Sequence, residues 1–321
     1  MTISANVAWA LMILSMICWG SWANTFKLTR GVRFELFYWD YAIGMAATAF
    51  VLAALKDTTT VGGTFPGSLL TTAPAALVQT AAAGIVFNLA NLLLVAAIAM
   101  TGLAVAFPVA IGTALIVGTA LTFYVDRKGA PWGLALGVSF AAVAIVCCAA
   151  AYRTQPKELQ VTRKGVVICL VSGLLMASWV PLAAASMHKT PHYLTPLASL
   201  AVFAMAALLS TVPFNLYLMR RPLIDMPVSM RDYFAGGIRW HLLGLLGGFV
   251  WTIGTASNLV AGNSVGFAVS YAIGQSAPLV ASLWGILVWK EFAGAGPAAT
   301  RALAAMFLFY LAAIGILSRA T

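Results

Sequence analysis

Charged side chains are scarce in this sequence. Only 8% of its 321 residues are Asp, Glu, Lys or Arg, whereas soluble domains average roughly 25%. Hydrophobic residues make up 62% of the chain, which is more apolar surface than a soluble fold of this size can bury. The composition therefore excludes an ordinary soluble protein and indicates an integral membrane protein.

Residues that usually carry out catalysis or bind metals are also few. The chain has 3 histidines, His188, His192 and His241, all near predicted loops, and 4 cysteines in apolar runs. The cysteines lack the spacing of metal ligands. There is no phosphate-binding loop or nucleophile elbow, and no segment is left over for a nucleotide-binding domain. We therefore expect neither an enzyme nor a primary pump, with no catalytic residue, metal, cofactor or nucleic-acid partner.

Long apolar runs fill most of the chain. Each is long enough to cross a bilayer, which takes about 20 helical residues, and none alternates like an outer-membrane barrel strand. The first run lacks the basic segment and cleavage site of a signal peptide, so we interpret it as a retained span. The predicted fold class is all-α integral membrane, with ten transmembrane helices. The predicted spans are residues 5–27, 35–55, 76–99, 102–124, 131–152, 165–186, 192–218, 239–261, 264–289 and 299–318.

Basic residues are divided unequally between the two sides of these spans. The odd-numbered loops carry 13 of the 18 Lys and Arg residues, and the even-numbered loops with the C-terminus carry 5. Cytoplasmic loops of membrane proteins are enriched in Lys and Arg. We therefore expect a multi-pass protein of the plasma (inner) membrane, with its odd-numbered loops in the cytoplasm and both termini facing outward.

The chain also divides into two similar halves. A central cytoplasmic loop, residues 153–164, separates a first set of five predicted helices, residues 1–152, from a second set, residues 165–321. Residues 13–27 align weakly with residues 170–184, and Ala110-Ile111-Gly112 aligns with Ala272-Ile273-Gly274. Because five is odd, the halves would have opposite orientations. We expect a 5+5 inverted repeat, which is typical of alternating-access transporters with a site near the midplane.

Two acidic residues are candidates for proton coupling. Asp40 is the only acidic residue well inside a predicted span, near the cytoplasmic start of the second. Burial makes a carboxylate hold a proton more tightly and a nearby cation has the opposite effect, so Asp40 could take up and release a proton. The alternative is a structural ion pair or hydrogen bond, for instance with Lys27. Glu35 is the second candidate, and its place near the interface favours a structural role.

Side chains that can bind a small polar ligand lie near the middle of several spans. Amides present both donors and acceptors, and indole rings stack on a flat heterocycle or a sugar face. The alternatives are hydrogen bonds between helices for the amides and threonines, and the interfacial aromatic belt for Trp22 and Trp179. The candidate substrate-binding residues are Trp19, Trp22, Tyr41, Asn88, Asn91, Thr113, Trp179, Trp251, Tyr271 and Gln275.

Three short motifs resemble a known group of transporters. Cys18-Trp19-Gly20-Ser21-Trp22, Trp39-Asp40-Tyr41 and Phe87-Asn88-Leu89-Ala90-Asn91 are similar to the ten-helix branch of the drug/metabolite transporter superfamily. Bacterial relatives of the ureide permeases are closest, and the glucose/ribose uptake and rhamnose–proton symporter families are more distant. The resemblance implies an inverted repeat, alternating access and proton-coupled import. Plant ureide permeases have a long central loop with a nucleotide-binding-like motif, which the short loop 153–164 lacks.

Together these features predict a secondary active transporter. We expect proton-coupled uptake of a small neutral polar metabolite, either ureide- or nucleobase-like or a sugar, by alternating access. The alternatives are an exporter of amino acids or drug-like metabolites and an uncoupled facilitator. The expected partners are the small-molecule substrate, a proton or another cation, and the lipid bilayer, with the protein a monomer or a homodimer.

Overall fold

The computed structural model describes residues 3–56, 65–101, 103–154, 162–188, 193–224 and 226–320. This part of the chain is helical and contains no strand. The elements are α1 (Ala5–Ser21), α2 (Ala23–Lys27), α3 (Phe34–Lys56), α4 (Phe65–Thr71), α5 (Pro74–Thr101), α6 (Leu103–Ala106), the π-helix η1 (Phe107–Ile111), α7 (Gly112–Asp126), α8 (Pro131–Tyr152), α9 (Arg163–His188), α10 (Pro196–Arg220), α11 (Met230–Phe234), α12 (Ile238–Val265), α13 (Phe267–Gly274), α14 (Ala277–Leu287) and α15 (Pro297–Leu317).

The helices confirm the predicted all-α membrane fold. Within the described residues, 9 helical segments are long and apolar enough to cross a membrane, and they match nine of the ten predicted spans. The remaining prediction, residues 264–289, corresponds to two shorter helices, α13 and α14, which are separated at Gln275 and Ser276. The first span is also divided, because α1 and α2 meet at Trp22.

Local sequence signals explain where several helices begin. The Ser4 hydroxyl accepts a hydrogen bond from the Val7 amide at the start of α1, and Thr195 caps α10 in the same way, just before Pro196. A side-chain oxygen at this position satisfies an amide that the helix itself cannot pair. Between α12 and α13 the backbone turns at a single residue, Gly266, with φ of +112°. Only glycine adopts this conformation without strain.

Small residues let the helices of the bundle approach closely. The main packed pairs are α5 with α9, α8 with α15, α3 with α12, α1 with α12, α7 with α9, and α5 with α10. A Cβ atom placed on Gly248 of α12 would lie only 2.2 Å from the Tyr41 carbonyl oxygen of α3. Membrane helices associate through such contacts because lipid gives them no hydrophobic drive to pair.

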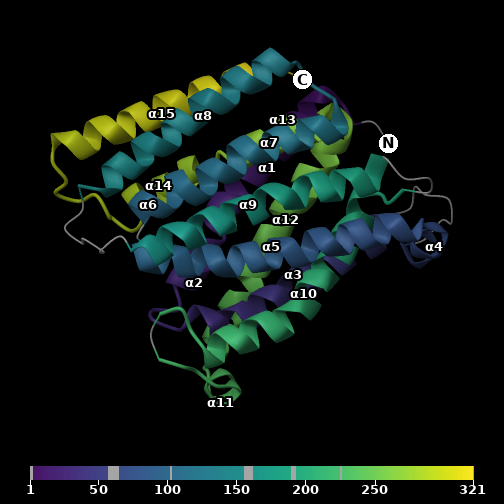
Figure 1. Ribbon diagram of the computed structural model, residues 1–321, viewed down its shortest axis with the longest axis horizontal. Helices are drawn as coiled ribbons and strands as arrows, with labels where there is room; N and C mark the ends of the chain where they lie inside the picture. The colour runs from purple at the N-terminus through teal and green to yellow at the C-terminus, as the bar shows by residue number, and fades with distance from the viewer. Residues whose placement is uncertain are drawn as a thin grey trace.

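Figure 1 shows the helices as a bundle with a central group of helices and a further layer of helices along each of two opposite edges. Helices α8 and α15 lie side by side along one edge, and α10 with the short α11 lies along the other. Helices α1, α5, α7, α9 and α12 occupy the centre. The start of α1 and the end of α15 lie toward the same end of the bundle in this view.

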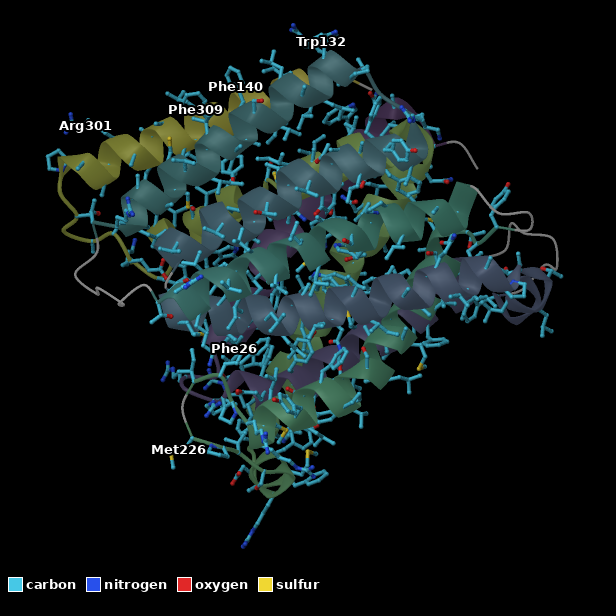
Figure 2. The ribbon with its side chains drawn as sticks, viewed as in Figure 1. Phe26, Trp132, Phe140, Met226, Arg301 and Phe309 are labelled. Carbon is cyan, nitrogen blue, oxygen red and sulfur yellow. The ribbon has the colours of Figure 1, made fainter. Side chains whose placement is uncertain are left out.

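The outer edge formed by α8 and α15 is apolar along its length. Figure 2 shows Phe140 and Phe309 on this edge, between Trp132 near one end and Arg301 near the other. The rings of Phe140 and Phe309 are 5.7 Å apart, and Leu308 and Leu311 are also exposed. Apolar side chains exposed in a continuous band are what a lipid-facing surface needs.

Candidate functional site

A cavity of about 290 Å³ lies inside the bundle. It begins among buried side chains near the middle of the spans and extends to the end that carries the odd-numbered loops. Six of the ten candidate substrate-binding residues line it, and they come from α1, α5, α9, α12 and the breaks at Trp22 and Gln275. These six are Trp19, Trp22, Asn91, Trp179, Trp251 and Gln275.

Aromatic rings form the inner end of the cavity. The Trp19 and Trp251 rings are stacked, with centroids 6.5 Å apart and planes 15° apart, and the edge of Trp179 meets Trp19 at 6.1 Å. Phe87 lies 4.4 Å from Trp251. A Cβ atom on Gly274 would lie 2.6 Å from the Trp19 ring. Only glycine at this position leaves enough space for the indole. The resulting surface is aromatic, and neighbouring rings hold each indole in place.

Amide side chains supply the polar part of the wall. Asn91 is only 3% exposed and donates weakly, at 3.4 Å, to the Tyr38 hydroxyl. Gln275 lies at the break between α13 and α14. Asn24, from α2, accepts a hydrogen bond from the Trp289 indole at 2.5 Å. Because an amide both donates and accepts, these groups suit a neutral ligand that carries N–H and C=O groups.

The structure places the other four candidates outside the cavity wall. Asn88 connects helices, because its oxygen accepts from the Tyr38 hydroxyl at 2.8 Å and its nitrogen donates to Ser210. The buried Tyr271 hydroxyl donates to a backbone carbonyl of α7. Tyr41 is buried behind Trp22, with ring centroids 4.9 Å apart. Thr113 is half-buried where α7 packs on α9.

Paired charges lie at the mouth of the cavity, which we define as Lys27, Tyr152, Trp289 and Glu291. Lys27 forms an ion pair with Glu291 and lies 4.5 Å above the centre of the Trp289 ring. The Tyr152 hydroxyl donates to the other oxygen of Glu291 at 3.1 Å. The interpretation that Lys27 pairs with Asp40 is wrong, because Lys27 forms its ion pair with Glu291.

Asp40 lies apart from the cavity and has two partners. His241 Nδ1 is 2.7 Å from Asp40 Oδ2, and the Tyr233 hydroxyl donates to Asp40 Oδ1 at 2.8 Å. Burial and the hydrogen bond to Asp40 raise the pKa of Tyr233. A Cβ atom on Gly244 would lie 2.5 Å from the Asp40 Cβ, so this glycine makes room for the carboxylate. Asp40 therefore joins α3 to α11 and α12.

Glu35, the second coupling candidate, is held by a neighbour. The Arg33 guanidinium pairs with both of its oxygens, at 2.6 and 3.1 Å, and Arg33 also donates to backbone carbonyls of the segment after α10. The geometry of Glu35 is that of a structural ion pair at the end of the bundle. In the described part of the chain, no three His, Cys, Asp or Glu side chains gather as they would around a metal ion.

His241 is the residue that the sequence reasoning missed. It lies in the first turn of α12, close to the preceding loop as predicted, but the sequence reasoning does not connect it with Asp40. A signal was present, because Asp40 and His241 both fall shortly after the start of an apolar span on the same side of the predicted topology. The two residues are 201 positions apart in the sequence, so no local pattern connects them.

A sequence model described as ureide permease matches residues 158–320, which is just over half of the chain and includes all of α9 to α15. The chain belongs to the ureide permease family. Membership makes this protein a membrane transporter and not an enzyme, as the sequence predicted.

Three Arabidopsis thaliana proteins are similar to this family member. Ureide permease 1 is 22% identical over an alignment that covers 98% of this chain and 97% of that protein. Ureide permease 4 is 20% identical, with 95% of each chain covered. Ureide permease 5 is 30% identical over 119 residues, which are 36% of this chain and only 28% of that protein.

One solved crystal structure also resembles this permease. It superposes with a TM-score of 0.65 at 15% sequence identity, covering 96% of this chain and 97% of the other. At this identity the likeness concerns the fold alone. The wider assignment to the drug/metabolite transporter superfamily and its ten-helix branch stays a prediction.

Proposed function

We propose that this ureide permease family member takes up a small, neutral, flat metabolite of the ureide or nucleobase type by alternating access. The observation that carries the proposal is the cavity, in which stacked indole rings and three amides face one space. Its volume of about 290 Å³ is at the lower end of the roughly 300–1,000 Å³ typical of ligand pockets. A compact heterocycle fits such a space better than a drug-sized molecule.

The charges on the cavity wall support a neutral substrate. Among the described residues, two charged side chains line the cavity, Lys27 and Glu291. They form an ion pair with each other. A charged substrate would have to break this pair to find a counter-ion, whereas a neutral one would not. Family membership supports the ureide class, and the flat indole surfaces favour a planar ring over a sugar.

The packing of the helices supports the inverted repeat on which alternating access would rest. If α1–α8 and α9–α15 are equivalent halves, the pair α5 with α9 corresponds to α12 with α1, and α3 with α12 corresponds to α10 with α5. Both members of each pair are packed together. The edge pair α8 with α15 corresponds to itself. A pseudo-two-fold relation between the halves produces this pattern of neighbours.

The conformation described here is open toward the odd-numbered loops. The distribution of Lys and Arg favours the cytoplasm for this side and the plasma membrane as the location, so we infer an inward-open state. In the proposed cycle, the aromatic end of the cavity separates the substrate from the outer side. Asp40 remains our candidate for the proton-coupling carboxylate, acting through α3 and α12 and not by contact with the substrate.

Transport by purified protein in proteoliposomes tests this proposal. Counterflow uptake of labelled uracil, of a cyclic ureide such as hydantoin, and of glucose would be compared. We expect uptake of a planar compound, with glucose excluded, and we expect Trp251→Ala to abolish it. Trp132→Ala is the matched control, because Trp132 is 88% exposed on the outer edge of α8. Uptake of glucose alone, or equal loss in both variants, would refute the proposal.

A further inference from the structure

Two ionisable side chains from distant parts of the chain meet beside the bundle centre. Asp40 of α3 is 6% exposed, and its two oxygens are separately engaged by His241 of α12 and Tyr233 of α11. The Tyr233 ring stands edge-on to the His241 ring, with centroids 4.9 Å apart and planes 86° apart. The imidazole is thus held in one orientation, with Nδ1 directed at the carboxylate.

The other charged groups nearby are engaged elsewhere or exposed. On α3, Glu35 is paired with Arg33. On α11, Asp232 accepts hydrogen bonds from Ser229. On α10, the uncharged Asn215 donates to the Glu35 carbonyl, and Met219 contacts the Trp39 indole. The exposed basic residues of the surrounding segments are Arg220, Arg221, Arg231 and Arg239. Among the described residues, His241 is therefore the ion-pair partner of Asp40.

A single proton decides the net charge of this pair. With His241 protonated and Asp40 ionised, the pair is neutral overall. When that proton leaves, a carboxylate beside a neutral imidazole carries one net negative charge in a poorly solvated place, which is unfavourable. Histidine is a common proton-binding side chain in proteins that respond to pH, and its contact with the Asp40 carboxylate makes His241 the candidate carrier of this proton.

The helices that carry the pair also form the cavity wall. His241 and the cavity residue Trp251 belong to the same helix, α12. On α3, Tyr41 follows Asp40 directly, its carbonyl faces Gly248 of α12, and its ring packs on Trp22 at the cavity wall. A change in how α3 meets α12 would therefore move residues on the cavity wall.

We propose that His241 and Asp40 together hold the coupling proton, with Tyr233 as a positioning residue that orients the carboxylate. This inference rests on the proposed proton-coupled uptake, and it makes His241 the group that gains or loses the charge. Proton binding fastens α3, α11 and α12 together, and proton loss loosens this contact during the cycle.

The protonation of His241 can be measured without any substrate. The double variant His188→Asn/His192→Asn leaves His241 as the only histidine of the 3, so ¹⁵N-histidine labelling in lipid bilayers reports on it alone by solid-state NMR. We expect a smaller protonated fraction of the imidazole with Asp40→Asn than with the native carboxylate at the same pH, because the carboxylate favours the charged form. An imidazole that never binds a proton at any pH at which the protein stays folded, or a protonated fraction that Asp40→Asn leaves unchanged, would overturn the proposal.

A transport experiment separates the coupling role from a structural one. Asn at position 241 can place its amide nitrogen where His241 has Nδ1, so His241→Asn keeps a donor to Asp40 but cannot take up a proton. An inward gradient of one pH unit is worth about 1.4 kcal/mol and can drive up to about tenfold accumulation. We expect this accumulation of labelled uracil or hydantoin with the wild type and its loss with His241→Asn, while counterflow exchange continues.

The controls distinguish this inference from the proposed function. His192→Asn should accumulate substrate like the wild type. Gradient-driven accumulation by His241→Asn, or wild-type accumulation that ignores the gradient, would overturn the role of the pair and leave uptake itself standing. Failure of the wild type to exchange any of the three probes would instead refute the proposed function, and the NMR titration would still decide whether the pair binds a proton.

Discussion

The Trp19 indole N–H donates to the Thr255 hydroxyl at 3.0 Å, across 236 residues of sequence. This bond joins α1 to α12 and fixes the orientation of the ring that forms the inner end of the cavity. Thr255 is fully buried and donates in turn to the Trp251 carbonyl. One threonine therefore links the Trp19 indole to the backbone of α12 at Trp251, the residue whose ring is stacked on Trp19.

Loss of this threonine hydroxyl should weaken substrate binding. Thr255→Val leaves the indole N–H without an acceptor, at a cost of about 1–3 kcal/mol, and about 1.4 kcal/mol corresponds to a tenfold change in affinity. We expect KM for uptake to rise about tenfold. Thr255→Ser keeps the oxygen and should behave like the wild type. Equal KM values for Thr255→Val and the wild type would contradict this role.

Asn88 and Asn91 should respond differently to substitution although they lie on the same helix. Asn88→Ala removes the acceptor of the Tyr38 hydroxyl and a donor to the Ser210 hydroxyl, so we expect stability to fall by about 1–3 kcal/mol. Asn91→Ala removes a group from the cavity wall and should mainly reduce affinity. Thermal unfolding in detergent, measured beside KM, separates the two. The prediction fails if Asn91→Ala lowers Tm as much as Asn88→Ala.

The contact between α3 and α12 at Gly248 should not accommodate any side chain at that position. Gly248→Ala places a methyl group 2.2 Å from the Tyr41 carbonyl oxygen, and forced overpacking of this kind typically costs about 1–3 kcal/mol. We expect a lower Tm and less folded protein by size-exclusion chromatography. Gly315→Ala of α15 is the matched control, because a Cβ atom there meets nothing within 4 Å. A destabilising effect of similar size at both glycines would show that the close contact at Gly248 is not responsible, since alanine by itself favours a helix over glycine.

The cavity should be reachable from the side of the odd-numbered loops. Ala281 of α14 lines the cavity, whereas Ala272 of α13 is buried in the core. A charged, membrane-impermeant thiol reagent should label Ala281→Cys from that side. It should leave Ala272→Cys unmodified, and it should also leave the protein with only its native cysteines unmodified. Substrate should slow the labelling. Reaction of Ala281→Cys only from the opposite side would contradict the inward-open state.

The short helix α11 should fray at acid pH. Hydrogen bonds from the Ser229 backbone and hydroxyl lower the pKa of Asp232, so the capping interaction stabilises α11 above the ordinary pKa of an aspartate. It is lost as pH falls through the lowered value. Protection of the α11 amides from hydrogen exchange, relative to the intrinsic rate at each pH, should fall in that range, and Asp232→Asn should remove most of this pH dependence. Protection that is equally pH-dependent in the variant would point to another group.

The sequence by itself determined the class of the protein and the position of nearly every span. Length and apolarity suffice for this, because a bilayer requires about 20 apolar residues in a helix and penalises any polar group that it cannot satisfy. The same penalty marked Asp40 and the amides inside spans, and together with aromatic residues that can stack on a ligand they make up the list of candidates from which six line the cavity. Even the two breaks at Trp22 and Gln275 fall at residues on that list.

Only the tertiary structure decided which way each polar side chain faces. A nearly uniform apolar helix can turn any face to lipid or to protein at similar cost, so the sequence pattern does not fix its rotation. Asn88 and Asn91, three residues apart, therefore look equivalent in sequence, although one connects helices and the other lines the cavity. The same holds for Asp40, whose partner His241 lies 201 residues away and becomes its neighbour only because glycines let α3 and α12 pack closely.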